Sequence, residues 1–240
     1  MDLRDKVAIV TGATKGIGLA IAEELLRRGT HVMICSRHQA DVDREVLRLN
    51  GMGAPGRAAG RTADVQDHRQ VKELVESCCA EFGGLDILIN NAGVGRFQNV
   101  AEMSPESWRE ILGTNLDGVF YACRYALPEI RRRGGGFIIN IGSLAGKNAF
   151  PGGAAYNASK FGLIGFSEAL MQEVRYDDIR VAYIMPGSVD TWFGGNPPSG
   201  QESWKLSATD VAQVVVETLT RHPRCLTSRI EMRPAKPPRK

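Results

Sequence analysis

Short runs of apolar, largely β-branched residues alternate along the chain with longer stretches in which apolar positions recur at helical spacing. The short runs are almost continuously apolar, which is typical of strands covered on both faces of a parallel sheet. The predicted strands are residues 7–10, 31–35, 61–63, 87–89, 137–141, 181–184 and, more weakly, 229–232.

The longer stretches predict helices, and two of them carry start signals. Ser104 precedes a proline at the first helical position, and Ser207 with Asp210 has the spacing of a capping box. Strands that alternate with helices in this way indicate an α/β fold with one doubly wound parallel sheet and helices on both faces, a single Rossmann-type domain spanning 1–240. The predicted helices are residues 16–28, 41–49, 68–82, 105–132, 156–176 and 208–221, with loops at 51–60 and 194–200 and a solvated tail at 234–240.

Composition narrows the class of protein. The 240 residues are 43 % hydrophobic and 24 % charged, a globular balance, and the net charge of +3 does not suggest a nucleic-acid-binding protein. No apolar run approaches the roughly 18 residues of a membrane span, and the N-terminus does not resemble a signal peptide. Five cysteines without C-x-x-C spacing and four scattered histidines predict free thiols in a reducing cytoplasm and no metal site.

A glycine-rich turn joins the first predicted strand to the first helix. Gly12 permits the tight turn, Gly16 lets a pyrophosphate approach the backbone, and Gly18 lets the helix pack closely on the strand. The spacing G-x-x-x-G-x-G differs from the standard dinucleotide fingerprint, and a merely tight turn is the alternative. The residues expected to line the phosphates are Gly12, Thr14, Lys15, Gly16, Ile17 and Gly18.

The end of the second strand indicates which dinucleotide binds. An NAD site usually has an acidic residue here, whereas this strand ends in Ser36 and Arg37. Both can donate hydrogen bonds to a 2′-phosphate, and Lys15 can supply a second cation. Either basic residue alone could be an ordinary surface charge, but together they predict NADP(H).

Polar and small residues follow the third and fourth strands, where the rest of the dinucleotide would lie. Asp64 can accept a hydrogen bond from the adenine amino group; the alternative is that it caps the next helix, a role that Asp67 can also fill. The further predicted cofactor contacts are Val65, Asn91, Ala92 and Gly93.

A candidate catalytic group follows the fifth strand. Ser143 lies at the carboxyl end of that strand, and Tyr156 and Lys160 are one helical turn apart on one helix face. A phenol has a pKa of about 10, and a nearby ammonium would lower it toward the range useful for proton exchange. Ser143 would then hold the substrate oxygen while Tyr156 transfers the proton.

The order and spacing of these motifs resemble the short-chain dehydrogenase/reductase family, from about residue 6 to 191. The resemblance implies that Tyr156 is the acid/base, that Ser143 stabilises the carbonyl or alkoxide oxygen, and that Lys160 binds the nicotinamide ribose and depresses the Tyr156 pKa. It also implies that Asn115 kinks the long helix and holds a water that relays protons. The segment expected around the nicotinamide comprises Pro186, Gly187, Val189 and Thr191.

Each catalytic residue taken singly has a structural alternative. Asn115 could satisfy buried backbone, Ser143 could be a cap or turn residue, and Lys160 could lie on a solvated face. A non-catalytic NADP(H)-binding sensor is therefore the competing class, although such proteins usually lose Tyr or Lys of the pair.

The resemblance also suggests a substrate class and partners. It places a short substrate lid at about 192–206, where Trp192, Phe193 and Trp204 predict an apolar pocket for a 3-oxoacyl thioester or a hydrophobic ketone. A reductase of free ketones, CoA thioesters or sugar-type alcohols is the alternative. The helices at 105–132 and 156–176 imply a homotetramer or homodimer.

Among family members, 3-oxoacyl-acyl-carrier-protein reductases look closest. Three arginines at 131–133 could contact an acidic carrier protein, or could simply suit a helix C-terminus. Asp177 and Asp178, where those reductases often have a basic residue, and a C-terminus without Gly-Gly make carrier-protein specificity doubtful.

Overall fold

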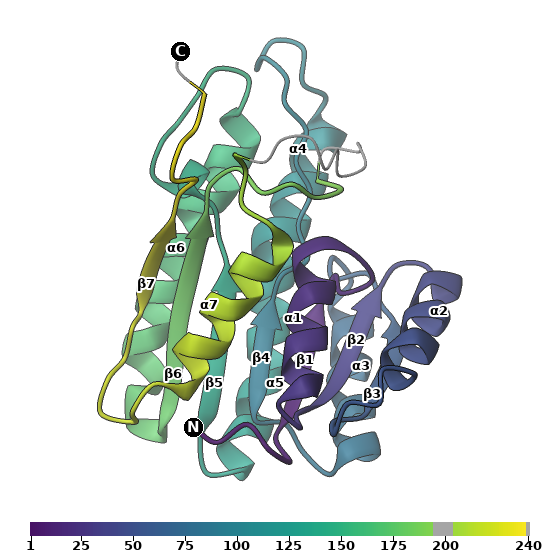
Figure 1. Ribbon diagram of the computed structural model, residues 1–240. Coiled ribbons are helices and arrows are strands. Elements are labelled where there is room, and N and C mark those ends of the chain that lie inside the picture. The colour runs from purple at the N-terminus through teal and green to yellow at the C-terminus, as the bar shows by residue number, and fades with distance from the viewer. Residues whose placement is uncertain (194–203, 239–240) are drawn as a thin grey trace.

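The computed structural model describes residues 1–193 and 204–238, which form one seven-stranded sheet with every neighbouring pair parallel (Figure 1). The strand order is β3-β2-β1-β4-β5-β6-β7. The strands are β1 Val7–Thr11, β2 His31–Ser36, β3 Ala58–Thr62, β4 Ile87–Asn90, β5 Gly136–Ile141, β6 Ile179–Pro186 and β7 Arg229–Met232.

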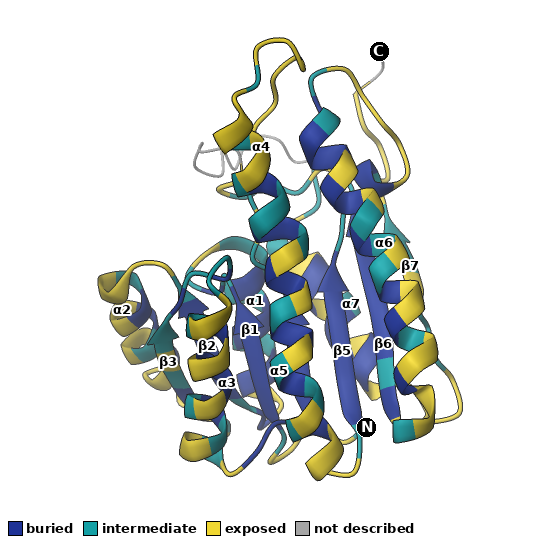
Figure 2. Cartoon of the chain, turned by 180° about the vertical axis from the view of Figure 1, so that it is seen from behind, coloured by how far each residue is buried: buried dark blue, intermediate teal, exposed yellow. Residues whose placement is uncertain are grey.

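Helices cover both faces of this sheet, so the doubly wound α/β prediction is confirmed. One face carries α1, α2 and α7, and the other, turned to the viewer in Figure 2, carries α3, α5 and α6. The α-helices are α1 Gly16–Arg27, α2 Gln39–Asn50, α3 His68–Phe82, α4 Pro105–Leu112, α5 Gly118–Arg132, α6 Ala154–Val174 and α7 Ala208–Thr220.

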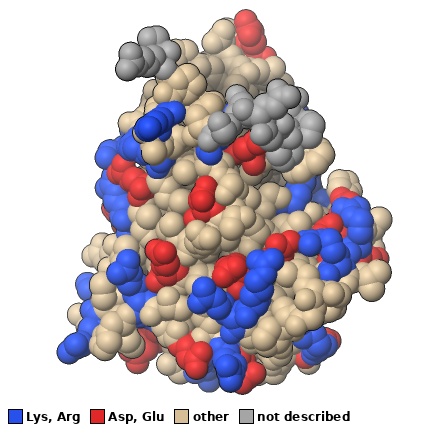
Figure 3. Space-filling view, in the orientation of Figure 1, with Lys and Arg blue, Asp and Glu red and all other residues tan. Residues whose placement is uncertain are grey.

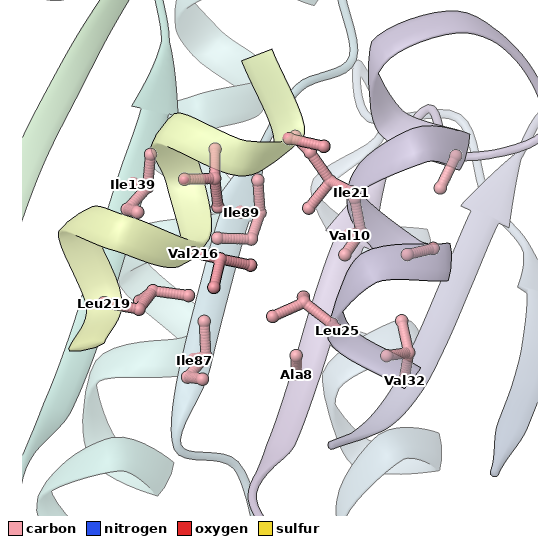
Figure 4. Packing of buried hydrophobic residues seen from close by; sticks show 14 of the residues in the cluster. Ala8, Val10, Ile21, Leu25, Val32, Ile87, Ile89, Ile139, Val216 and Leu219 are labelled. Carbon is pink, nitrogen blue, oxygen red and sulfur yellow. The ribbon is translucent and has the colours of Figure 1, made fainter. Parts of the chain in front are cut away.

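The continuous apolar runs of the strands are explained by the two cores. Along β1, Ala8 and Val10 face the core under α1 and α7, whereas Val7 and Ile9 face the core under α3, α5 and α6. Figure 4 shows the first core, where Leu25 of α1 points toward the β1 side chains. Because successive strand side chains alternate between faces and both faces are buried, successive positions from Val7 to Val10 are all apolar.

The capping predictions are confirmed. Ser104 accepts a hydrogen bond from the backbone N–H of Ser107, and Ser207 forms a capping box with Asp210. The helix predicted over 105–132 is interrupted by a π-helical turn, η1, at Gly113–Asp117.

The third strand was misplaced. The sequence predicts it at 61–63, directly after a loop that ends at residue 60, but it begins at Ala58 and ends at Thr62. The sequence AAGRT has no Val or Ile and only one β-branched residue, Thr62, so pairing with β2 rather than local propensity sets its position. The loop predicted at 194–200 and most of the lid predicted at 192–206 lie outside the described residues.

The three arginines at 131–133 lie at the amino ends of the strands, because α5 runs antiparallel to them and leads into β5. Arg131 pairs with Asp177 at 2.7 Å, and Arg132 pairs with Glu129. Arg133 pairs with the buried Asp86, at 3.2 Å. These cations therefore stabilise the edge of the sheet from which the strands start.

Surface charge is mixed in sign. On the face drawn in Figure 3, Lys and Arg side chains lie interspersed with Asp and Glu. Pairs such as Arg48–Glu23, 2.6 Å apart, account for this pattern. Within the described residues, no helix is both long and apolar enough to cross a membrane.

Candidate active site

A cleft of about 570 Å³ opens at the carboxyl ends of the strands, near the point between β1 and β4 where the strand order reverses. Ligands of doubly wound sheets bind at this position, and the volume suits a cofactor or a small ligand. All predicted site residues line it except Gly18 and Asn115, which are buried. The predicted residues lining the cleft are Gly12, Thr14, Lys15, Gly16, Ile17, Ser36, Arg37, Asp64, Val65, Asn91, Ala92, Gly93, Ser143, Tyr156, Lys160, Pro186, Gly187, Val189 and Thr191.

The glycine turn has the form that a pyrophosphate needs. Gly12 adopts φ of +63°, and a Cβ there would lie 2.9 Å from Ala92 Cα. A Cβ on Gly18 would lie 2.4 Å from Asn91 Nδ2, so Gly18 serves the packing of α1 against the chain after β4. The α1 N-cap, Lys15, makes no side-chain cap hydrogen bond, so the first-turn N–H groups are available to an anion. The turn therefore fits a dinucleotide phosphate.

The end of β2 carries an ion-pair bridge across the cleft. Arg37 Nη1 lies 3.9 Å from Glu110 Oε1 on α4, and Glu110 Oε2 accepts a hydrogen bond from Arg96 Nε at 2.8 Å. Arg37 is half-exposed and all three side chains line the cleft. Glu110 thus pairs with Arg37, the cation predicted to meet a 2′-phosphate, as well as with Arg96.

The contacts of Asp64 decide between its two predicted roles, an adenine contact and the N-cap of α3. Asp67 is the N-cap of α3 and accepts a hydrogen bond from Arg69 N, so Asp64 does not cap this helix. Asp64 Oδ1 accepts from Gln66 N at 3.0 Å, and the residue lines the cleft. An adenine contact by Asp64 remains a prediction.

Ser143 and Tyr156 meet at the base of the cleft. Ser143 caps the short 3₁₀ helix η2, Leu144–Gly146, by accepting a hydrogen bond from Ala145 N at 3.1 Å, which leaves its hydroxyl proton available. Tyr156, in the first turn of α6, is only 8 % exposed. Burial raises the Tyr156 pKa above its ordinary value, and a hydrogen bond with Ser143 acts in the opposite direction.

Lys160 is buried beside them instead of lying on a solvated face. Its Nζ donates a hydrogen bond to the Ile141 carbonyl at 2.9 Å and lies 5.8 Å from the centroid of the Tyr156 ring. Burial lowers the Lys160 pKa to about 8. The resemblance implies that this ammonium depresses the Tyr156 pKa, but the pKa is raised, because removal of the phenolate from water outweighs the opposing hydrogen bond with Ser143.

Asn115 lies in the π-helical turn η1 and is fully buried. Its Oδ1 accepts from Val94 N at 2.8 Å, and its Nδ2 donates to Val94 O at 2.9 Å and to Ser159 Oγ at 3.0 Å. The side chain therefore satisfies buried backbone, the structural alternative weighed for it, and joins the chain after β4 to α6. Single π-turns inside α-helices are frequent at functional sites.

The segment after β6 crosses the cleft. Lys15 Nζ lies over the Trp192 ring, 5.7 Å from its centroid, and the Phe193 ring lies 5.5 Å from that of Tyr156. Lys15, in the glycine turn, is thus in cation–π contact with Trp192, which follows β6. Farther along, Leu206 N donates to Ser188 O at 3.0 Å, which brings the chain on either side of residues 194–203 together.

The sequence did not predict several of the residues that line the cleft. Arg96 and Glu110 come from a loop and a helix with no local motif, and Thr114 lies in the π-turn. The one available signal was the position of Arg96 and its neighbours directly after the 90–93 motif, at the carboxyl end of β4.

The buried ammonium of Lys160 predicts a pH dependence of stability. Its pKa is about 8 in the folded chain and 10.5 ordinarily, so between these values the unfolded chain binds more protons and wild-type stability rises with pH. At about 1.4 kcal/mol per pKa unit, the stability of Lys160→Met relative to wild type should fall by roughly 2–3 kcal/mol from about pH 7 to pH 10. Urea unfolding of both cofactor-free proteins across this range measures the difference; a constant or growing advantage of the variant would contradict the assignment.

Comparisons with known proteins agree with this geometry. The family model described as short chain dehydrogenase matches residues 6–201. The chain is 37 % identical to dehydrogenase/reductase SDR family member 4 of Caenorhabditis elegans, covering 89 % of this chain and 82 % of the relative. It is 38 % identical to the 3-oxoacyl-[acyl-carrier-protein] reductase FabG of Escherichia coli K12, covering 80 % and 76 %.

A solved structure resembles the whole fold. It is an alcohol dehydrogenase from the archaeon Thermococcus sibiricus complexed with 5-hydroxy-NADP, with a TM-score of 0.90 and 27 % identity, covering 98 % of this chain and 99 % of that one.

Proposed function

The chain belongs to the short-chain dehydrogenase family, and we propose that it is an NADP(H)-dependent oxidoreductase that reduces the carbonyl of a hydrophobic ketone or a 3-oxoacyl thioester. One observation carries the proposal: Ser143, Tyr156 and Lys160 lie in the same cleft as an uncapped glycine turn. The NADP-type ligand of the structural relative and the absence of an acid at the end of β2 support the choice of cofactor.

The residues of the cleft divide the chemistry between them. Bound in the cleft, NADPH would supply the hydride for the carbonyl carbon and would itself be oxidised to NADP⁺. The Tyr156 hydroxyl donates the proton that turns the carbonyl oxygen into an alcohol, and Ser143 donates a hydrogen bond to the same oxygen. Lys160 holds positive charge beside Tyr156, and Asn115 keeps the chain after β4 against α6.

Cofactor binding by this chain's residues follows from the same geometry. The glycine turn and the N-terminus of α1 would hold the pyrophosphate, Arg37 and Ser36 the 2′-phosphate, and Thr191 the nicotinamide side. The arginines at 131–133 are not part of this proposal, since they form ion pairs at the amino ends of the strands, away from the cleft at the carboxyl ends.

Consumption of NADPH by the purified protein tests the function. The panel contains acetoacetyl-coenzyme A, acetoacetyl-carrier protein and simple ketones, with sugar-type alcohols and NADP⁺ in the reverse direction. We expect turnover of at least one carbonyl substrate, faster with NADPH than with NADH. Tight NADPH binding without turnover of any member would instead favour a non-catalytic sensor.

A further inference from the structure

Two phenylalanine rings from separate segments contact the Tyr156 ring, and a third packs against one of them. Phe97 follows β4, Phe150 precedes α6, and Phe193 follows β6. The Phe97 ring meets the Tyr156 ring edge-on, with centroids 5.7 Å apart and planes at 87°, and Phe193 lies 5.5 Å from Tyr156 at 52°. Phe150 extends the group, 5.6 Å from Phe97. We call these three residues the phenylalanine wall.

The wall is exposed although the tyrosine behind it is not. Phe97, Phe150 and Phe193 are 51 %, 41 % and 45 % exposed, against 8 % for Tyr156. Phe193 lines the cleft, and Phe97 and Phe150 continue the aromatic surface from it. Grouped aromatic surface is unfavourable in water, and a ligand that covers it regains the hydrophobic free energy. The wall therefore has the character of a contact surface for an apolar ligand.

The backbone holds the wall in place around the catalytic helix. Gln98 N donates to Gly152 O at 2.8 Å, which ties the loop of Phe97 to the loop of Phe150. Phe150 N donates to Oδ1 of Asn157, a buried residue next to Tyr156 on α6, at 3.3 Å. These bonds fix two rings relative to the reacting hydroxyl, so the wall is preorganised.

The chain also leaves room for the rings. Gly95 lines the cleft, and a Cβ there would lie 2.5 Å from Phe193 Cζ and 3.3 Å from Phe97 Cζ. The neighbouring cation is paired, because Arg96 Nε donates to Glu110 Oε2 at 2.8 Å. The space beside Tyr156 is thus bounded by rings.

We propose that the substrate is a ketone whose carbonyl carbon bears an aryl ring, and that Phe97 and Phe193 determine this specificity. The proposal rests on the reductase function above and narrows its substrate class. Edge-to-face and offset ring pairs contribute about 0.5–1.5 kcal/mol each beyond the area they bury. A flat ring loses little rotational freedom on binding, whereas a linear acyl chain would be ordered at a cost in entropy.

Acetophenone and 2-octanone, ketones of equal carbon number, separate the two substrate classes. We expect wild-type kcat/KM with NADPH to be higher for acetophenone by about tenfold. Phe97→Leu and Phe193→Leu keep apolar volume but remove a ring, and each should raise the acetophenone KM several-fold while 2-octanone stays within about twofold. Tyr176→Ala, 91 % exposed in the 3₁₀ turn after α6, is the control outside the site.

Ligand-detected NMR of acetophenone with the NADP⁺-loaded protein, a pair that cannot react, adds a readout independent of turnover. Weaker acetophenone binding by the leucine variants, with unchanged NADPH binding, supports the wall. Wild type that prefers 2-octanone or acetoacetyl-coenzyme A, or variants that lose both ketones equally, would overturn the aryl assignment and leave the reductase function standing. No turnover of any carbonyl would overturn both.

Discussion

Tyr156→Phe is expected to lower kcat for carbonyl reduction by about 10²- to 10⁴-fold, the usual contribution of a positioned general acid, while NADPH binding stays within about twofold. The change removes one hydroxyl and keeps the ring, so the contacts of Tyr156 with Phe97 and Phe193 persist. Single-turnover oxidation of NADPH, followed with a saturating ketone, and fluorescence titration with NADPH measure the two quantities separately.

Tyr183→Phe is the matched control for this experiment. Tyr183 is also buried, but its hydroxyl donates to Glu168 Oε1 at 2.6 Å, and neither residue lines the cleft. Loss of this hydroxyl should leave kcat near the wild-type value. If both variants lost activity equally, or if Tyr156→Phe retained more than about a tenth of kcat, Tyr156 would not be the acid.

The raised pKa of Tyr156 makes the proton assignment more specific. Because burial favours the neutral phenol, the residue is protonated near neutral pH and suited to donating a proton. The reductive direction therefore needs no prior ionisation of Tyr156, whereas alcohol oxidation requires its phenolate. We accordingly expect the reverse reaction to be favoured by higher pH.

The parts of the fold that the sequence predicted best have strong local signals. Residues 87–89 are continuously apolar and became the core of β4, and the Ser207 capping box marks the start of α7. The bounds of the third strand were predicted wrongly because Ala58–Thr62 is not a continuous run of large apolar residues. Its position depends on α2, since a Cβ on Gly60 would lie 2.4 Å from Val42 Cγ1.

Site residues, too, were predictable only where a local pattern marks them. Motif residues such as Gly12 and Lys160 were predictable because their spacing reflects one turn or one helix face. The Arg37–Glu110 contact joins β2 to α4, and Phe97 meets Phe150 only through the tertiary fold. No periodicity links such positions, so partners that come from distant segments had to be seen in three dimensions.

Arg37→Asp is expected to weaken NADPH binding by about 100-fold and to change NADH binding by only about twofold. A charge-assisted hydrogen bond to the 2′-phosphate contributes up to about 3 kcal/mol, which corresponds to roughly two orders of magnitude in Kd, and the new carboxylate would also repel the phosphate. Titrations with 2′,5′-ADP and 5′-ADP isolate the 2′-phosphate from the nicotinamide end. Equal losses for both fragments would rule out this site.

Arg37→Asp removes both the predicted phosphate contact of Arg37 and its ion pair with Glu110. Glu110→Gln removes only the ion pair, so comparing the two variants separates the two effects. The neutral amide cannot form an ion pair with Arg37, 3.9 Å away, or with Arg96, 2.8 Å away. Both arginines remain in the cleft. Because the Glu110 carboxylate competes with a 2′-phosphate for Arg37, we expect this variant to bind 2′,5′-ADP as tightly as wild type or a few-fold more tightly, most clearly at low ionic strength. If Glu110→Gln instead weakened 2′,5′-ADP as much as Arg37→Asp, Glu110 would be positioning the guanidinium, and the bridge would be part of the phosphate site.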